Sequence, residues 1–152
     1  MKKQATGALV LAWCLFIAGC GVNKSIIVAD GEKITGGRST VNGSVTIGRG
    51  CVVAGTRRSV NGTVEVGDGS RVGGLSTVNG KIECGRDVTV DSDAESINGS
   101  LSLDSGSQVG GSVETINGTI ELVHASVARD IRTVNGRVRL AEKSVVAGDL
   151  IV

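Results

Sequence analysis

The chain has 152 residues with 16 basic and 15 acidic side chains, and its formal net charge of +1 excludes the strongly basic surface of most nucleic-acid-binding proteins. It contains 24 glycines but no proline and no tyrosine, and its single Trp, Phe and Met all lie within the first 19 residues. The remainder therefore lacks the aromatic side chains that sugar- and base-binding sites normally use, and it cannot form an ordinary aromatic-rich core.

Residues 1–19 have the order of a bacterial export signal. Lys2 and Lys3 precede an apolar segment, residues 8–19, that is too short to cross a bilayer. The sequence Ile-Ala-Gly-Cys that ends at Cys20 resembles a bacterial lipobox. This resemblance implies cleavage before Cys20, diacylglycerol on its thiol and acylation of the new amino terminus, which together anchor a protein stably. We therefore expect a lipoprotein signal peptide; the alternative is a plain signal peptide.

The residue after the lipobox bears on the destination of the mature chain. Position 21 is glycine rather than the aspartate that resembles an inner-membrane retention mark in enteric bacteria, which favours the outer membrane, on its periplasmic side. Without Lys2 and Lys3 the mature chain has 14 basic and 15 acidic residues, so nothing in its charge indicates a nucleic-acid partner.

A triplet of an aliphatic residue, asparagine and glycine recurs through the rest of the sequence. Successive copies are 19, 18, 19, 19 and 18 residues apart, and a degenerate copy begins at Val22, 19 residues before the first. Seven units thus fill residues 22–152, so residues 20–152 are expected to form one repeat domain without a linker. The complete triplets contain Asn42, Gly43, Asn61, Gly62, Asn79, Gly80, Asn98, Gly99, Asn117, Gly118, Asn135 and Gly136.

Each unit divides into three segments of six residues that open with an aliphatic residue, as at Val60, Val66 and Val72. The spacing is lengthened to seven only in the third segment, as between Val53 and Val60, which predicts an extra residue always at one corner. Short β-branched segments separated by glycine favour strands over helices. The fifth residue of the first segment is also aliphatic in every unit: Ile26, Val45, Val64, Ile82, Leu101, Ile120 and Val138.

These patterns predict an all-β fold: a single-stranded parallel β-helix, triangular in section, with about seven coils of 18–19 residues after an N-terminal signal helix. Coils about 4.8 Å apart would make a rod roughly 34 Å long. Its interior is narrow, so Val, Ile, Leu and Ser fill it without aromatic residues. The extra corner residue and the Asn-Gly corner favour a right-handed helix over the left-handed one of hexapeptide acyltransferases.

The Asn-Gly pairs are expected at a corner because both residues tolerate left-handed backbone conformations. Stacked asparagine side chains can also hydrogen-bond from coil to coil, as they do in ladders of stacked strands. The predicted role of the triplets is therefore structural.

The repeated Thr-Val-Asn-Gly and Ser-Val-Asn-Gly sequences resemble two groups of bacterial repeat proteins. One group is the bactofilins, cytoskeletal proteins with a triangular right-handed β-helix that polymerise end to end. The other is a set of adhesin-like β-helix proteins with recurrent valine-asparagine-glycine coils. The resemblance implies the β-helical fold and a polymerising surface, while the lipobox separates this chain from the bactofilins, which usually work in the cytoplasm.

Few residues are candidates for chemistry. His124 is the only histidine, and hexapeptide acyltransferases use a histidine as general base, but we interpret it as a surface corner residue because no extended loop accompanies it. Cys51 and Cys84 differ in register by two coils, about 10 Å, which is beyond disulfide reach. We expect both to be small buried apolar residues; the alternative is an intermolecular bridge.

Two charged clusters have simple interpretations. Asp91, Asp93 and Glu95 could attract calcium, but the tandem glycine-aspartate nonapeptides of calcium-binding β-helices are missing, so we expect a solvated corner and no metal or other cofactor. Arg57 and Arg58 resemble a local exposed pair.

A column of Ser and Thr precedes the triplets, and a regular outward threonine array would suit ice binding. We expect a charged neighbouring column to spoil such a flat surface. The Ser/Thr column comprises Thr40, Ser59, Thr77, Ser96, Thr115 and Thr133. The neighbouring outward column comprises Thr46, Glu65, Glu83, Ser102, Glu121 and Arg139.

The carboxyl end of the repeat supplies the main functional prediction. Stacked repeats normally need polar caps, and the last unit ends on the apolar residues Leu150, Ile151 and Val152. We expect a non-enzymatic, membrane-anchored envelope lipoprotein that acts as a structural or polymer-forming scaffold, with itself or another envelope protein as partner and no small-molecule substrate. The alternatives are a monomeric adhesin-like binding module and, remotely, a hexapeptide-type acyltransferase.

Overall fold

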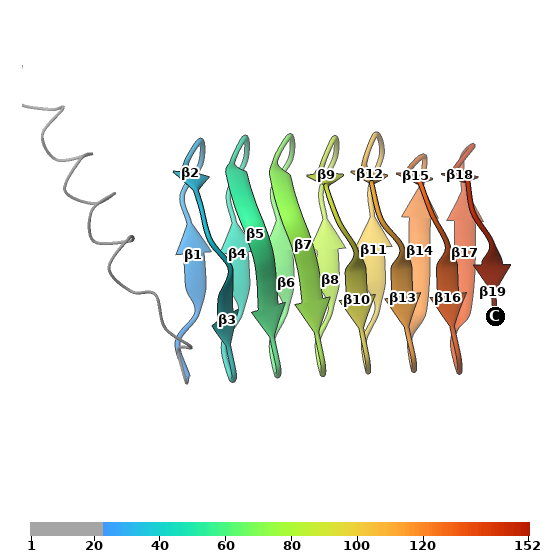
Figure 1. The fold of residues 1–152 in the computed structure, drawn as a ribbon, viewed down its shortest axis with the longest axis horizontal. Helices are drawn as coiled ribbons and strands as arrows, with labels where there is room; N and C mark the ends of the chain where they lie inside the picture. Colours follow the sequence, from blue (N-terminus) through green and yellow to red (C-terminus); the bar gives the residue numbers. More distant parts are fainter. Residues whose placement is uncertain (1–22) are drawn as a thin grey trace, which may run out of the picture.

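The structure is a computed structural model that describes residues 23–152, so the expected signal peptide at 1–19 and Cys20 lie outside the described residues. The described part contains nineteen short strands and no helix (Figure 1). The strands are β1 (Ile26–Val28), β2 (Lys33–Ile34), β3 (Arg38–Thr40), β4 (Val45–Ile47), β5 (Val52–Ser59), β6 (Val64–Val66), β7 (Arg71–Thr77), β8 (Ile82–Cys84), β9 (Thr89–Val90), β10 (Ala94–Ser96), β11 (Leu101–Leu103), β12 (Gln108–Val109), β13 (Val113–Thr115), β14 (Thr119–Val123), β15 (Ser126–Val127), β16 (Ile131–Thr133), β17 (Arg137–Ala141), β18 (Val145–Val146) and β19 (Leu150–Ile151).

The strands stack in three parallel columns and form a rod of seven coils (Figure 1). The first face is a seven-stranded sheet in the order β1-β4-β6-β8-β11-β14-β17, and these strands number the coils from one to seven. The second and third faces join in a twelve-stranded sheet, because β5 in coil two and β7 in coil three run through both faces. Paired residues are 18 or 19 positions apart, as in Val64 with Ile82 and Ile26 with Val45. The predicted seven-coil parallel β-helix is confirmed.

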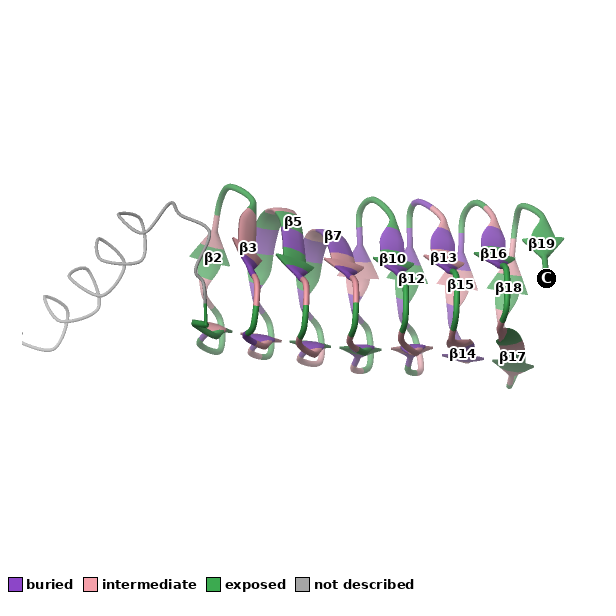
Figure 2. Ribbon diagram, turned by 90° about the horizontal axis from the view of Figure 1, so that it is seen from below, coloured by how far each residue is buried: buried purple, intermediate pink, exposed green. Residues whose placement is uncertain are grey.

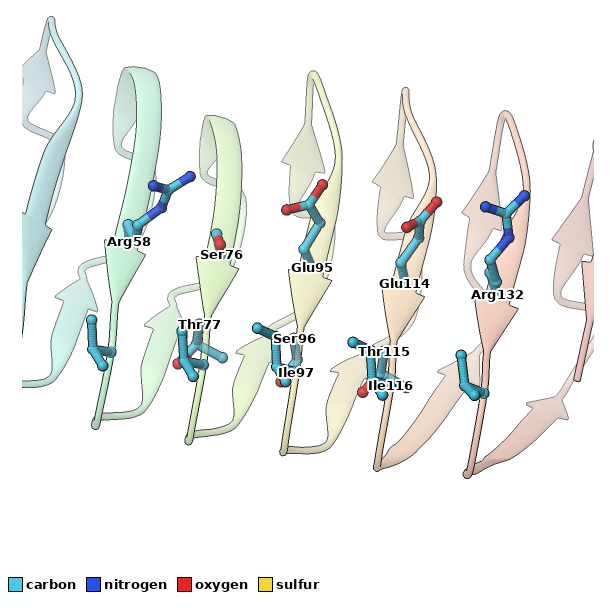
Figure 3. Close-up of a pocket in the computed structure, with 13 residues that line it drawn as sticks. Arg58, Ser76, Thr77, Glu95, Ser96, Ile97, Glu114, Thr115, Ile116 and Arg132 are labelled. Carbon is cyan, nitrogen blue, oxygen red and sulfur yellow. The ribbon is translucent and has the colours of Figure 1, made fainter.

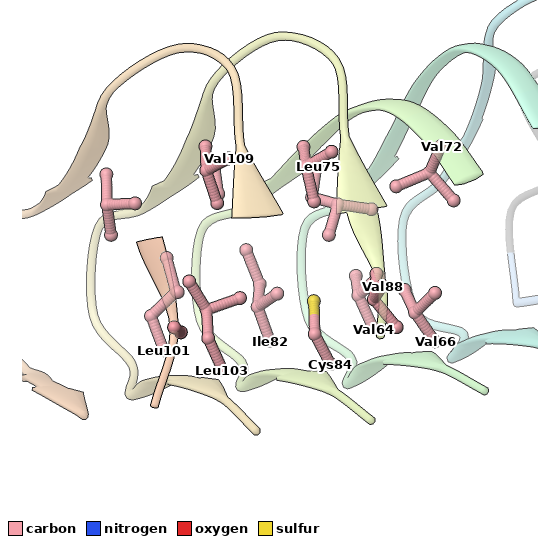
Figure 4. Packing of buried hydrophobic residues seen from close by; sticks show 14 of the residues in the cluster. Val64, Val66, Val72, Leu75, Ile82, Cys84, Val88, Leu101, Leu103 and Val109 are labelled. Carbon is pink, nitrogen blue, oxygen red and sulfur yellow. The ribbon is translucent and has the colours of Figure 1, made fainter. Parts of the chain in front are cut away.

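The aliphatic column of the first face has the predicted register. Its seven members pair in order from Ile26 to Val138, and those of coils two to six are buried. Figure 4 shows Val64, Ile82 and Leu101 packed along the interior together with residues of the opposite strands. Since each coil contributes only a few aliphatic side chains, the core is continuous along the rod but thin across it.

The outward column that the sequence predicts beside these residues is also in register. Thr46 pairs with Glu65, which pairs with Glu83, and the series continues through Ser102 and Glu121 to Arg139 at the other end. The members are exposed or partly exposed. The first face therefore alternates between inward aliphatic and outward polar residues, as a half-buried strand requires.

The column of Ser and Thr before the triplets lies inside the solenoid, so the prediction that it faces outward is wrong. Ser59 is fully buried, and its hydroxyl donates a hydrogen bond to the carbonyl oxygen of Gly43 in the preceding turn, at 2.8 Å. A buried carbonyl oxygen needs such a donor, which an aliphatic side chain cannot supply. The whole column is buried: Thr40, Ser59, Thr77, Ser96, Thr115 and Thr133.

The aliphatic residue of each triplet consequently faces outward. Ile97, Ile116 and Val134 are 41%, 43% and 63% exposed. Residues of the same types that open the other two segments of a unit are buried, as at Val66 and Val72. Because side chains alternate along an extended chain, burying the hydroxyl residue turns its aliphatic neighbour to solvent.

Glycine is required in the triplets for space and not for a left-handed conformation. A Cβ on Gly99 would collide with the carbonyl oxygen of Gly80 in the preceding coil, and the other triplet glycines meet the coil before them in the same way. A left-handed φ, between 48° and 78°, recurs instead at the corner that leaves the first face: Gly31, Gly50, Gly69, Asp87, Gly106, His124, Glu142 and Lys143. The other described residues with a positive φ are Asn23, Gly36 and Gly55.

The coils differ in length at two corners. In β5 an extra residue forms a bulge between Val53 and Thr56, at the corner where the sequence predicts it. Coil six departs from that rule at a different corner. The segment between Leu122 and Ser126 is one residue shorter than the segment between Leu103 and Gln108, the residues of coil five that pair with them. The shortened corner contains His124, so length varies at more than one corner.

Candidate interaction surfaces

The asparagines of the triplets form an uninterrupted ladder along one edge of the rod. In each of six hydrogen bonds, Nδ2 donates to Oδ1 of the asparagine in the preceding coil over 2.7 to 3.2 Å. The members are Asn23, Asn42, Asn61, Asn79, Asn98, Asn117 and Asn135. Each bonded amide uses one of its two Nδ2 hydrogens and its Oδ1 in the ladder, so the ladder stabilises this edge of the rod.

A groove of about 630 Å³ runs along the third face from coil two to coil six (Figure 3). Exposed or half-exposed aliphatic residues form one side of it: Val60, Val78, Ile97, Ile116 and Val134. A column of outward residues forms the other side: Arg58, Ser76, Glu95, Glu114 and Arg132. In Figure 3, Glu95 and Glu114 project side by side, with Arg58 and Arg132 at the two ends of the row. The groove combines an apolar strip with charged residues, a composition that suits an extended protein surface more than a small molecule.

Coil seven exposes a group of aliphatic residues. Leu150 is 50% exposed, although Ile131, with which it pairs in coil six, is completely buried; Leu140 and Leu122 show the same contrast. Ile151 and Val152 are 42% and 71% exposed. Figure 2 shows this end of the rod, including β18 and β19, coloured mainly as exposed. The apolar column of the interior thus continues to the surface of coil seven.

Arg57 is buried and is not part of an exposed pair, so that prediction is wrong. Its relative exposure is 0%, whereas its neighbour Arg58 lies on the outer side of the same strand. The bulge in β5 precedes Arg57, and inward and outward residues alternate after it through Ser59. The guanidinium Nη1 donates to the carbonyl oxygen of Gly36 over 2.6 Å. A buried cation in a core of aliphatic residues is the most unusual group in the described chain.

His124 is an exposed corner residue, as predicted, with a left-handed φ of 49°. A shallow pocket of about 290 Å³ lies beside it and includes Ser126 and Lys143. Within residues 23–152 no side chain hydrogen-bonds to the imidazole. The arrangement therefore lacks the orienting group that a histidine general base normally has.

Both described cysteines are buried and free. The Cys51 thiol lies 3.0 Å from the carbonyl oxygen of Ala29, to which it donates. Burial raises the pKa of Cys84 to about 12. The prediction that Cys51 and Cys84 are small buried apolar residues is confirmed.

The acidic cluster is divided among separate structural contacts. Asp91 pairs with Arg71, whose Nη2 lies 2.9 Å from Oδ1, and Asp93 accepts a hydrogen bond from the amide of Ser112 over 2.7 Å. Glu95 belongs to the groove. In the part of the chain that the structure describes, no three His, Cys, Asp or Glu side chains form a group that could hold a metal ion.

Comparison with known proteins supplies no relative. A scan against protein-family models finds no match, and searches of curated proteins and of solved structures find none either. Residues 23–152 include no helix with the length and apolar character to span a membrane.

Proposed function

We propose that the chain is a non-enzymatic lipoprotein of the bacterial cell envelope whose β-solenoid serves as a scaffold and self-associates through coil seven. In this proposal Cys20 carries the lipid, the rod lies on the periplasmic side of the outer membrane, and the only added group is the covalent lipid. The observation that carries the scaffold role is the exposed apolar surface of coil seven, above all Leu150 and Ile151.

The strands of coil seven support an interface because they combine two features. β17, β18 and β19 each pair with a strand of coil six and, within residues 23–152, have no strand paired on their other edge. An open strand edge is a template for pairing with another chain, and exposed aliphatic side chains add burial energy to such pairing. A charge placed there should oppose association without disturbing coils one to six.

The assembly is tested by sedimentation of the full chain in a non-ionic detergent. We expect higher-order species for the wild type and loss of these species for Leu150→Asp. Val52→Asp is the matched control, since Val52 is 41% exposed in β5, between the two ends of the rod, and its substitution should leave the size unchanged. An unchanged size for Leu150→Asp would contradict the scaffold role through coil seven.

The lipid anchor is tested separately. Cells that express the full chain are labelled with radioactive palmitate, and we expect label and membrane association that disappear in Cys20→Ser. Label that persists in this variant, or its absence from the wild type, would remove the anchor from the proposal without affecting the argument for coil seven.

The groove of the third face favours a second candidate function, a monomeric adhesin-like binding module. Its exposed aliphatic strip, including Ile97 and Ile116, would contact the partner. This candidate predicts a monodisperse monomer in the sedimentation experiment, together with binding to envelope or surface proteins that Ile116→Asp abolishes. Retained binding by Ile116→Asp would exclude the groove.

A further inference from the structure

Two arginines occupy the first two positions of the inward column of the third face, which is otherwise apolar. In coils three to seven the column holds aliphatic residues: Leu75, Ala94, Val113, Ile131 and Leu150. In coils one and two it holds Arg38 and Arg57, which are paired in register. Arg57 is completely buried and Arg38 is partly buried, and the two positive charges are close enough to affect each other.

The orientation of Arg57 leaves one edge of its guanidinium open. Nη1 donates to Gly36, but Nε and Nη2, both buried, have no hydrogen-bond partner among residues 23–152. Nε and Nη2 lie on the same edge of the planar group, and this edge binds the two oxygens of a carboxylate or phosphate with parallel hydrogen bonds. The unsatisfied atoms thus constitute one complete bidentate donor.

The charge of the site calls for an anion. Burial, with a contribution from the positive charge of Arg38, lowers the pKa of Arg57 to about 10, which still leaves the guanidinium protonated at neutral pH. Arg57 forms no ion pair with another described residue, whereas Arg49, Arg71, Arg86 and Arg139 each form one. An unpaired buried charge is strongly unfavourable, so a bound counter-ion would relieve the cost of burying Arg57.

The site is close to solvent through a corner of coil one. Gly36, which accepts the hydrogen bond from Arg57, and its neighbour Gly37 are exposed. A Cβ at Gly36 would meet no atom within 4 Å, so nothing packs against that side of the corner. Nε and Nη2 themselves are closed to solvent, so an anion would reach them only if this exposed corner moved aside.

We propose that Arg57 forms an oxyanion-binding site at the amino-terminal end of the solenoid, with Nε and Nη2 holding two oxygens of a phosphate group that enters at the Gly36–Gly37 corner. Arg38 adds a second positive charge, which favours a phosphate over a singly charged carboxylate. The phosphate could be free or could belong to a phospholipid headgroup, and the experiment distinguishes these sources.

The test uses the full ¹⁵N-labelled chain in a non-ionic detergent. The Nε–H signal of Arg57 is assigned by its loss in Arg57→Leu, which introduces the residue type found at position 75 of the same column. Titration with sodium phosphate at constant ionic strength, balanced with chloride, should shift this signal saturably and raise the thermal midpoint by roughly 3 °C or more. A shift that does not saturate, or no shift, would overturn the proposal.

Three variants separate the site from a general charge effect. Arg58→Leu removes the adjacent outward arginine and should keep the full response to phosphate. Arg57→Lys keeps the charge without the bidentate edge and should weaken phosphate binding at least tenfold. Arg57→Leu should show no phosphate-dependent rise in midpoint. An equal response in Arg57→Lys and the wild type would contradict the proposed geometry, even if Arg57→Leu does not fold.

The source of the phosphate is resolved by competition. Short-chain phosphatidylglycerol, added below its micelle concentration, is compared with inorganic phosphate on the same Nε–H signal. Tighter binding of the lipid would support the site and assign it to a headgroup, whereas binding of inorganic phosphate alone would support a free-ion site. Failure of both probes to shift the signal would overturn the proposal.

Discussion

The side-chain Nδ2 of Asn98 donates a hydrogen bond to Oδ1 of Asn79 over 2.9 Å, while Oδ1 of Asn98 accepts one from Asn117. Asn98→Ala removes both bonds, and we expect a loss of about 1–2 kcal/mol in the free energy of unfolding. Asn135 takes part in one bond of the ladder, with Asn117, so Asn135→Ala should cost about half as much. Urea denaturation of both variants tests this, and equal losses would contradict a cooperative ladder.

The two kinds of glycine should respond differently to substitution. Gly99→Ala places a Cβ against the carbonyl oxygen of Gly80, so coils four and five must separate locally, and we expect a loss of about 3 kcal/mol or more. Gly50 has φ of 64° with open space around its Cβ, and Asp87 occupies the equivalent corner of a later coil. Gly50→Asn should therefore cost less than about 1 kcal/mol. Thermal denaturation of the two variants provides the comparison, and similar losses would refute the distinction.

The inward and outward aliphatic columns provide a third prediction. Ile82 is completely buried in coil four, and Ile82→Ala should leave a cavity that costs about 3–4 kcal/mol. Ile97, of the same residue type but 41% exposed, should cost about 1 kcal/mol or less when replaced by alanine. If chemical denaturation gave the larger loss for Ile97→Ala, the assignment of the triplet aliphatics to the outer face would be wrong.

Cys84 should make stability depend on alkaline pH. Burial raises the pKa of its thiol to about 12 in the folded chain, whereas an exposed thiol in the unfolded chain titrates near 8.5. Because the raised pKa favours the protonated native state, its contribution is complete below about pH 8.5 and is lost as the pH rises toward 12. We expect Cys84→Ala to remove this component of the alkaline slope in denaturation curves. Identical slopes between pH 8.5 and 10.5 would contradict the shift.

The reactivity of the same thiol is a related measurement. At pH 8 a maleimide reagent should label Cys84 only after addition of denaturant, and peptide mass spectrometry distinguishes its peptide from those of the other cysteines. Rapid labelling of the folded chain would show that coil four opens readily.

The coil spacing and much of the register could be predicted because they repeat. The column from Ile26 to Val138 recurs at intervals of 18 or 19 residues, and only a parallel stack of coils buries all of its members together. Seven repetitions of this spacing indicate the parallel stack, which the sequence of a single short strand could not do. The outward polar column through Glu65 and Glu83 follows from the same alternation.

The repeat spacing does not predict which of the residues beside each triplet faces the interior and which faces solvent. Ser59 and Val60 are neighbours, and hydropathy alone favours burying the valine. The structure instead buries the hydroxyl, because the carbonyl oxygen of Gly43 lies inside the corner and needs a donor. Arg57 is a different case. Its column is aliphatic in later coils, as at Leu75 and Ala94, so the repeat indicates an inward position, whereas the charge of two adjacent arginines favours an exposed pair.

The asparagine ladder also gives the rod a direction. Every bond runs from Nδ2 of one coil to Oδ1 of the coil before it, from Asn135 back to Asn23. The last amide of the ladder, Asn135 in coil seven, therefore presents its acceptor oxygen on the side away from coil six. A second rod that approached with its first coil could continue the series with a donor, whereas two rods meeting at their seventh coils would bring like partial charges together. Contacts along this edge thus favour head-to-tail assembly, in which coil seven meets the first coil of the next rod, over symmetric pairing of two seventh coils.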